Sequence, residues 1–207
     1  MKGKFYEIPD KYKFSTIFAS AIKPVVSEEK DKYLSLASLE QLRKYNAKAT
    51  FFCIGNNVAE HFSLYKNMIE DGHKPGNHTY DHLNGWREKD KNYLENIFRA
   101  KQVIDSNLFR PPYGKITKFQ LKQLSGEKYK LTTIMWDVIS GDFDKKVSAE
   151  DCFLNVARNA NSGSIIVFHD SEKAFPKLQY ALPRLLEYFS SKSFEFRVVE
   201  NKIVNNS

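Results

Sequence analysis

The stretch Ala49-Thr-Phe-Phe-Cys-Ile54 decides the fold class. It is a short, continuous apolar run rich in β-forming residues, which is typical of a parallel strand buried on both faces. Helical patterns flank it over residues 28–44 and 57–70, and the second is followed by Asp71-Gly72, a helix stop. This alternation predicts strands connected by helices, as in an α/β protein with a parallel sheet.

The same alternation continues to the end of the chain. We expect further helices over residues 90–105, 148–160 and 178–189, and further strands over residues 131–136, 164–168 and 194–199. No linker, repeat or low-complexity tract interrupts the pattern. Because 207 residues also fit one domain, a single domain is predicted over residues 1–207.

Composition and charge exclude several classes of protein. An aromatic content of 14% is too high for a disordered chain, and no apolar run approaches the ~18 residues of a membrane span. The net charge of +7 is spread along the chain without a basic stripe, so no nucleic-acid partner is expected. The first residues lack the apolar stretch of a secretory signal peptide, so we expect a cytoplasmic protein or a trimmed protein of the cell envelope.

Two histidines four residues apart stand out in Asn77-His-Thr-Tyr-Asp-His82. Their imidazoles could converge on one metal ion if the segment forms a helical turn or a tight loop. Surface or capping histidines are the alternative interpretation. The pair directly follows a strand-like segment, which is where the functional loops of α/β folds lie.

His169 follows the apolar run Ser164-Ile-Ile-Val-Phe168 and precedes Asp170. A histidine at the carboxyl end of a strand suits a general acid, because imidazole changes charge near neutral pH. A hydrogen-bonded strand-end histidine beside a capping aspartate is the alternative. Trp136-Asp-Val-Ile-Ser-Gly-Asp-Phe143 places Asp142 in another loop after a strand, where aspartates are usually solvated or capping.

The segment Phe109-Arg-Pro-Pro-Tyr-Gly114 is rigid, because its two prolines fix backbone dihedrals and Gly114 permits a tight turn. Such a segment could hold Arg110 against a carboxylate and direct a backbone N–H at an oxyanion. A purely structural turn is the alternative.

Taken in their order along the chain, these motifs resemble the polysaccharide deacetylases of the NodB-homology type, carbohydrate esterase family 4. The resemblance extends from about residue 16 to residue 200. It implies a distorted (β/α) barrel with a site for a divalent metal, usually Zn²⁺. It also implies hydrolysis of acetyl groups on a glycan such as peptidoglycan or chitin.

The resemblance assigns roles residue by residue. The implied roles are metal ligands (His78 and His82), the arginine that orients the base (Arg110), the oxyanion donor (the Tyr113 N–H), the catalytic acid (His169), the aspartate that tunes it (Asp142) and a wall of the acetyl-methyl pocket (Val167). Trp86 and Phe143 could form sugar-stacking walls of a substrate groove, with packing as the alternative.

The family's first motif, Thr-Phe-Asp-Asp-Gly-Pro, supplies the base and a third metal ligand, and both aspartates are missing here. A register over Ile17–Pro24 puts Ala19 and Ser20 in their places. A gap-free register counted back from residue 45 puts Ser27 and Glu28 there instead. We favour the first register because of its strand character.

Without the two aspartates, we expect a weaker metal site and an arginine without its partner. Glu28, Glu29 and Asp81 are candidate substitutes for the lost carboxylates. The sequence predicts a hydrolase that removes N- or O-acetyl groups from a polysaccharide or oligosaccharide, with altered or reduced activity. A catalytically inactive carbohydrate-binding member of the same family is the alternative.

Overall fold

The computed structural model describes residues 15–18 and 32–200 of the chain, with side chains from residue 37 onward. Its described strands form one seven-stranded sheet in the order β5-β4-β3-β2-β1-β7-β6, and every strand pair is parallel. The α/β fold with a parallel sheet is therefore confirmed. The predicted single domain over residues 1–207 includes segments outside the described residues and stays a prediction.

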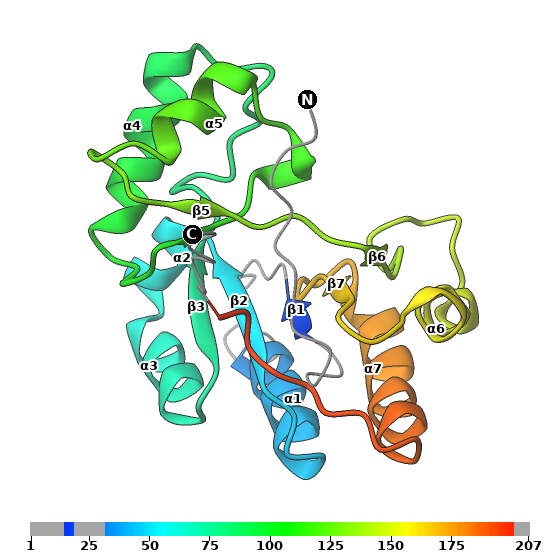
Figure 1. The fold of residues 1–207 in the computed structure, drawn as a ribbon. Helices are drawn as coiled ribbons and strands as arrows, with labels where there is room; N and C mark the ends of the chain where they lie inside the picture. The colour runs from blue at the N-terminus through cyan, green and yellow to red at the C-terminus, as the bar shows by residue number, and fades with distance from the viewer. Residues whose placement is uncertain (1–14, 19–31, 201–207) are drawn as a thin grey trace, which may run out of the picture.

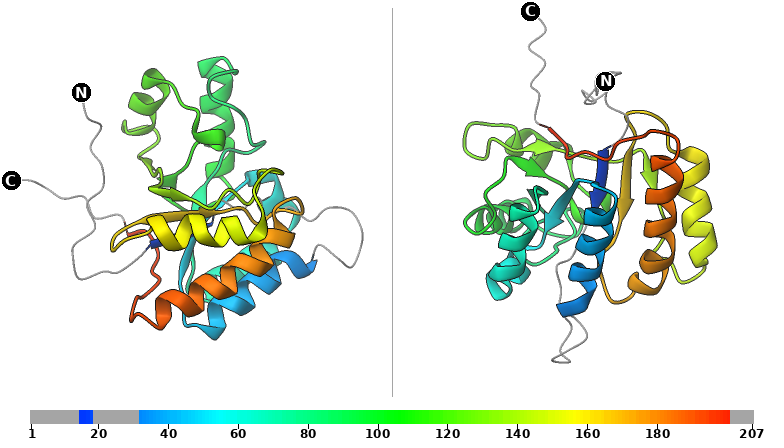
Figure 2. Two further views of the ribbon diagram at one scale, coloured as in Figure 1. Left: turned by 90° about the vertical axis from the view of Figure 1, so that its right-hand side faces the viewer. Right: turned by 90° about the horizontal axis from the view of Figure 1, so that it is seen from below.

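Strands and helices alternate as the sequence predicts, and the helices lie on the outside of the sheet (Figures 1 and 2). The strands are β1 (Ser15–Phe18), β2 (Ala49–Cys53), β3 (Lys74–Asn77), β4 (Leu108–Phe109), β5 (Thr132–Thr133), β6 (Val138–Ile139) and β7 (Ile165–Phe168). The helices are α1 (Lys32–Lys44), α2 (Gly55–Glu60), α3 (Phe62–Glu70), α4 (Asp90–Lys101), the 3₁₀ turn η1 (Pro112–Gly114), α5 (Lys118–Leu124), α6 (Ala149–Asn159) and α7 (Phe175–Ser190).

The two edges of the sheet lie close together in the sequence. The edge strands are β5 and β6, and only residues 134–137 connect them. Because an extended chain advances at most about 3.6 Å per residue, this connection can span no more than about 18 Å. The sheet therefore curves round on itself as a distorted, open (β/α) barrel (Figure 1).

Strand β2 shows why the barrel is buried on both faces. All five of its residues are buried. Phe51 belongs to the large core cluster beneath the outer helices, whereas Phe52 belongs to a second cluster with Leu108 and Val199. Successive strand residues point to opposite faces, so the continuous apolar run fills both layers.

Two predicted elements differ from the structure. The helix expected over residues 57–70 is two helices, because His61 leaves helical geometry at φ −126° and ψ 47°. The strand expected over residues 194–199 does not join the sheet, and only Arg197 in it forms an isolated bridge. The Val199 N–H donates to the hydroxyl of Thr50 rather than to a backbone carbonyl, so no strand ladder forms there.

Candidate active site

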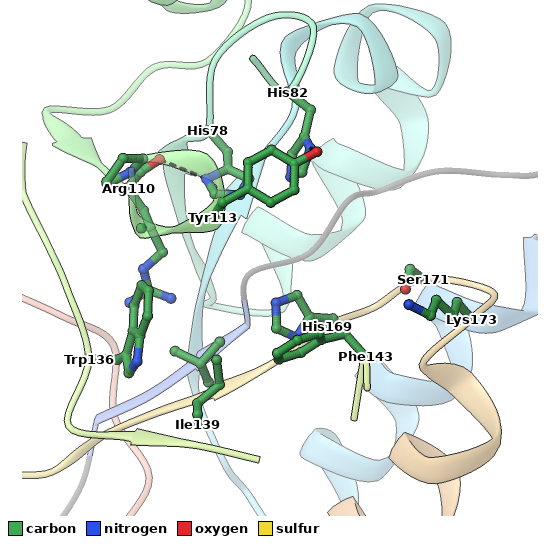
Figure 3. Close-up of a pocket in the computed structure, with 13 residues that line it drawn as sticks. His78, His82, Arg110, Tyr113, Trp136, Ile139, Phe143, His169, Ser171 and Lys173 are labelled. Atoms are coloured by element: carbon green, nitrogen blue, oxygen red, sulfur yellow. Dashed lines mark hydrogen bonds between the residues drawn. The ribbon is translucent and has the colours of Figure 1, made fainter. Parts of the chain in front are cut away.

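The predicted site residues follow different strands and meet at one end of the barrel. His78 follows β3, Arg110 follows β4 and His169 follows β7. Because all strands are parallel, their carboxyl ends share one edge of the sheet. Figure 3 shows the resulting cavity, of about 490 Å³. It is lined by His78, His82, Arg110, Pro111, Tyr113, Gly114, Trp136, Ile139, Phe143, Val167, His169, Ser171 and Lys173.

A backbone hydrogen bond orients His78. Its Nδ1 lies 2.7 Å from the carbonyl oxygen of Arg110, and a carbonyl only accepts, so Nδ1 carries the proton. The other ring nitrogen, Nε2, is then left with its lone pair, which is the form that binds a metal. Burial, followed by the neighbouring His82, Arg110 and His169, lowers the pKa of His78 well below its usual value, so the ring is neutral at pH 7.

His82 lies beside His78 in a tight loop rather than in a helical turn. The loop turns sharply because Thr79 and His82 adopt left-handed backbone conformations, at φ 65° and 57°. The two imidazole centroids are 5.1 Å apart. The Nδ1 of His82 lies 3.1 Å from the hydroxyl oxygen of Tyr113. The structure therefore brings the two predicted histidines together, as Figure 3 shows.

His169 and Asp142 form a closed pair on the opposite wall. Asp142 is 0% exposed, and its Oδ1 lies 2.8 Å from the Nδ1 of His169. The backbone N–H of His169 donates to Oδ2 of the same carboxylate at 2.6 Å. Since an ionised carboxylate only accepts, Nδ1 carries the proton and Nε2 is the nitrogen left for a ligand. The partner of the His169 ring is thus Asp142, a residue 27 positions away, and not the adjacent Asp170.

Arg110 is a buried cation, with 1% of its surface exposed. Its Nε donates to the carbonyl of Ile134 and its Nη2 to that of Met135, at 3.2 and 2.9 Å. Its guanidinium carbon lies 4.4 Å from the centre of the Phe52 ring and 5.8 Å from that of Trp136. Nη1 is also buried, and nothing in the described part of the chain accepts a hydrogen bond from it. Burial lowers the pKa of Arg110 to about 9, so the group stays charged at pH 7.

Tyr113 and Gly114 make a strained turn at the cavity wall. Both are left-handed, at φ 59° and 66°. A Cβ on Gly114 would approach the Trp136 ring to 2.6 Å, so this position requires glycine. The N–H groups of Gly114 and Lys115 donate within the turn, whereas that of Tyr113 donates no backbone hydrogen bond within the described part of the chain.

The three residues predicted to line a substrate groove have different outcomes. Val167 and Phe143 line the cavity, and the ring of Phe143 lies 4.9 Å from that of His169. Trp86 does not line it. Its ring lies under the Lys115 ammonium at 4.0 Å, and its indole N–H donates to the carbonyl of Ile116, so neighbouring contacts hold it at the surface, 63% exposed.

Several lining residues were not expected from the sequence. Trp136 and Ile139 flank the start and end of β6, and Ser171 and Lys173 come two and four residues after His169. Their closeness to the carboxyl ends of β6 and β7 is the signal that could have identified them.

The substitutes expected for the missing carboxylates are only partly described. Ala19, Ser20, Glu28 and Glu29 lie outside the described residues. The favoured register agrees with the sheet to the extent that β1 ends at Phe18, the residue before Ala19. Asp81 does not substitute, because it does not line the cavity. Its carboxylate accepts from the side chain of Asn96 at 2.6 Å and lies 3.8 Å from Arg99.

Comparisons with known proteins agree with this geometry. A family model described as polysaccharide deacetylase matches residues 33–131. A peptidoglycan-N-acetylglucosamine deacetylase of Bacillus cereus is 32% identical over 167 residues, which are 78% of each chain. The chain belongs to the polysaccharide deacetylase family. Another Bacillus cereus deacetylase of the same name is 32% identical over 139 residues, but the chain spans only 50% of its length.

Solved structures of the polysaccharide deacetylase family share the fold. The Bc1960 peptidoglycan N-acetylglucosamine deacetylase, in complex with 4-naphthalen-1-yl-N-oxidanyl-benzamide, has a TM-score of 0.81 at 26% identity, over 92% of this chain and 88% of that chain. BA3943, a CE4 family pseudoenzyme from Bacillus anthracis, has a TM-score of 0.74 at 20% identity, over 92% of this chain and 65% of that chain. A BA3943 mutant with restored enzymatic activity has a TM-score of 0.76.

The described residues of this polysaccharide deacetylase fit a metal ion in part. The imidazoles of His78 and His82 are neighbours, and Nε2 of His78 has a free lone pair. Structural and catalytic zinc sites use at least three protein ligands. Within residues 37–200, however, no group of three or more His, Cys, Asp or Glu side chains could hold a metal. A third protein ligand would have to come from outside these residues. No helix of the described chain is long and apolar enough to cross a bilayer.

Proposed function

We propose that this family member is a metal-dependent hydrolase that removes N- or O-acetyl groups from a polysaccharide or oligosaccharide, with reduced activity. The observation that carries the proposal is the cavity itself. It joins the His78–His82 pair to the His169–Asp142 pair across one enclosed space. The peptidoglycan deacetylases among the relatives support an acetylated glycan, such as peptidoglycan, as the substrate.

His169 is the proposed acid. Asp142 holds its Nδ1 and its backbone N–H, which fixes the ring with Nε2 as the remaining titratable atom. In its protonated form, Nε2 carries the proton that the leaving amine or hydroxyl oxygen needs when the acetyl group departs. The buried carboxylate favours that charged form of the ring.

The Tyr113 backbone N–H is the proposed donor to the oxyanion. The left-handed turn at residues 113–114 fixes its direction before substrate arrives, so no reorganisation energy is spent during the reaction. A divalent metal, usually Zn²⁺ in this family, would polarise the acetyl carbonyl and activate water when held by His78 and His82. Val167 and Phe143 would enclose the acetyl group and the sugar ring.

The base is the weak point of this proposed site. No Asp or Glu is among the described residues that line the cavity, and the favoured register has Ala19 and Ser20 where the family carries aspartates. General base catalysis typically contributes about 10² to 10⁴ in rate. Loss of the base therefore supports slow rather than full turnover.

Acetate release tests the proposal. The protein would be incubated with acetylated chito-oligosaccharide and with peptidoglycan fragments, each with chelator, Zn²⁺ or Co²⁺, and folding would be checked by circular dichroism. Slow release that requires metal and is lost in His169→Ala supports the hydrolase. Absence of acetate from folded protein with every metal would reject it.

A catalytically inactive glycan-binding protein is the second candidate. Two observations favour it: the lack of a three-ligand metal group within residues 37–200, and the shared fold of the BA3943 pseudoenzyme. This candidate predicts glycan binding by calorimetry that chelator does not change, together with no acetate release. Metal-dependent acetate release excludes it.

A further inference from the structure

The charges around the cavity are one-sided. Arg110 and Lys173 line it together with three histidines, and no Asp or Glu is among the lining residues that the structure describes. Asp142, which lies directly behind His169, is 0% exposed, and both of its carboxylate oxygens interact with His169. It therefore balances the imidazole and leaves the other cations of the cavity uncompensated.

The positive charge of Arg110 has no counterion in the described part of the chain. Its hydrogen bonds go to two backbone carbonyls, and aromatic rings lie against the guanidinium. Carbonyl and aromatic groups carry partial charges, which offset a full unit charge only in part. Because the guanidinium is out of contact with water, solvent screens it poorly, and the cavity beside it keeps a positive potential.

Lys173 adds a second positive charge where a ligand can reach it. Its side chain is exposed, and it makes no ion pair with any residue between 37 and 200. Figure 3 shows Lys173 beside Ser171, across His169 from Arg110. An ammonium next to a hydroxyl supplies several donors and a full charge, which is suited to a carboxylate.

We propose that the cavity selects an acetylated glycan that carries a carboxylate on the acetylated sugar or on the sugar next to it, and that Lys173 binds this carboxylate. The inference rests on the proposed function and specifies its substrate class. The lactyl carboxylate of N-acetylmuramic acid is a group of this kind. Ser171 donates its hydroxyl to the same carboxylate, while the field of Arg110 favours an anion throughout the cavity.

Two ligands that differ only in charge test the proposal. One is the disaccharide of N-acetylglucosamine and N-acetylmuramic acid, and the other is its methyl ester, which keeps the shape but removes the charge. Calorimetry on wild type should give about fivefold tighter binding of the acid, the size of a partly exposed ion pair. Raising the salt from 50 to 500 mM should reduce that preference.

Lys173→Gln should reduce the preference to about onefold, because the exposed position tolerates glutamine while the charge is lost. The matched control is Lys91→Gln on α4, which removes one charge at a side chain that is 82% exposed and does not line the cavity. It should keep the full preference.

The outcomes separate the inference from the proposed function. Equal binding of acid and ester by wild type overturns the inference, even if acetate is released from neutral chito-oligosaccharide. A preference that survives Lys173→Gln also overturns it. If no glycan binds and none releases acetate, the proposed function itself fails. A preference for the acid that only Lys173→Gln removes supports the inference.

Discussion

The two walls of the cavity contain ionic groups in different states of completion. On the β6–β7 wall, Asp142 accepts from both the ring and the backbone N–H of His169, so every charge there has a partner. On the β4 wall, Arg110 is equally buried, yet its Nη1 has no acceptor among residues 37–200. One wall is a finished pair, and the other is half of one.

This difference shows where the site departs from the pattern of its family. The acid wall depends on two residues that are 27 positions apart, and both are present. The other wall depends on a carboxylate that the family carries directly after its first strand, and this chain has Ala19 and Ser20 after Phe18. A buried charge that keeps its place without a counterion costs free energy, so we infer that the surrounding geometry was built for a pair.

The largest expected effect comes from restoring the missing carboxylates. Ala19→Asp/Ser20→Asp should raise metal-dependent acetate release about 1,000-fold, because it returns a general base and a third metal ligand. The measurement is acetate release from acetylated chito-oligosaccharide in the presence of Zn²⁺. The isosteric control, Ala19→Asn/Ser20→Asn, has the same size without the charge and should stay at the wild-type rate. Equal rates in the two double variants would mean that the base comes from elsewhere.

A smaller loss is expected from breaking the complete wall. Asp142→Asn should lower acetate release about 100-fold, because the amide no longer stabilises the imidazolium and can donate to Nδ1, which selects the wrong tautomer. The effect is best measured in the Ala19→Asp/Ser20→Asp background, where the rate is high. Asp144→Asn, in the same loop but outside the cavity lining, is the control. If Asp142→Asn and Asp144→Asn behave alike, His169 is not the acid.

A still smaller effect is expected at the loop that carries the second histidine. Tyr113→Phe removes the hydroxyl that lies 3.1 Å from Nδ1 of His82 and should weaken Zn²⁺ binding about tenfold, the size of a lost outer hydrogen bond to a ligand. Calorimetric titration with Zn²⁺ measures it. Tyr180→Phe removes a hydroxyl that bonds to Glu150 on the surface and should leave Zn²⁺ affinity unchanged. Unchanged affinity in Tyr113→Phe would separate His82 from the metal.

The sequence predicted the long elements and the residues at the ends of strands. The alternation around Ala49–Cys53 gave the parallel sheet, and Ser148 begins α6 with a capping box to Asp151, as its pattern indicates. Strands β4 and β6 have only two residues each, too few for any periodicity. Strand β3 contains Pro75 and Gly76, which mark loops in a sequence.

The position of Gly76 has a tertiary cause, because a Cβ there would approach the Phe52 ring to 2.5 Å. The sheet needs a glycine at this point, and no local pattern reveals that contact. The same holds for the cavity. The pairing of His169 with Asp142 and the lining positions of Trp136 and Lys173 depend on how the strand ends meet in space.

The central claim is that Arg110 waits for a carboxylate that the residue after β1 no longer supplies. A double-mutant cycle between Ala19→Asp and Arg110→Met, read as the free energy of unfolding in urea, tests it most directly. The account predicts that Arg110→Met costs at least about 2 kcal/mol more in the Ala19→Asp background than in wild type, because only there does it break a buried ion pair. Effects that add to within about 0.5 kcal/mol would contradict the account, since the two positions would then not interact.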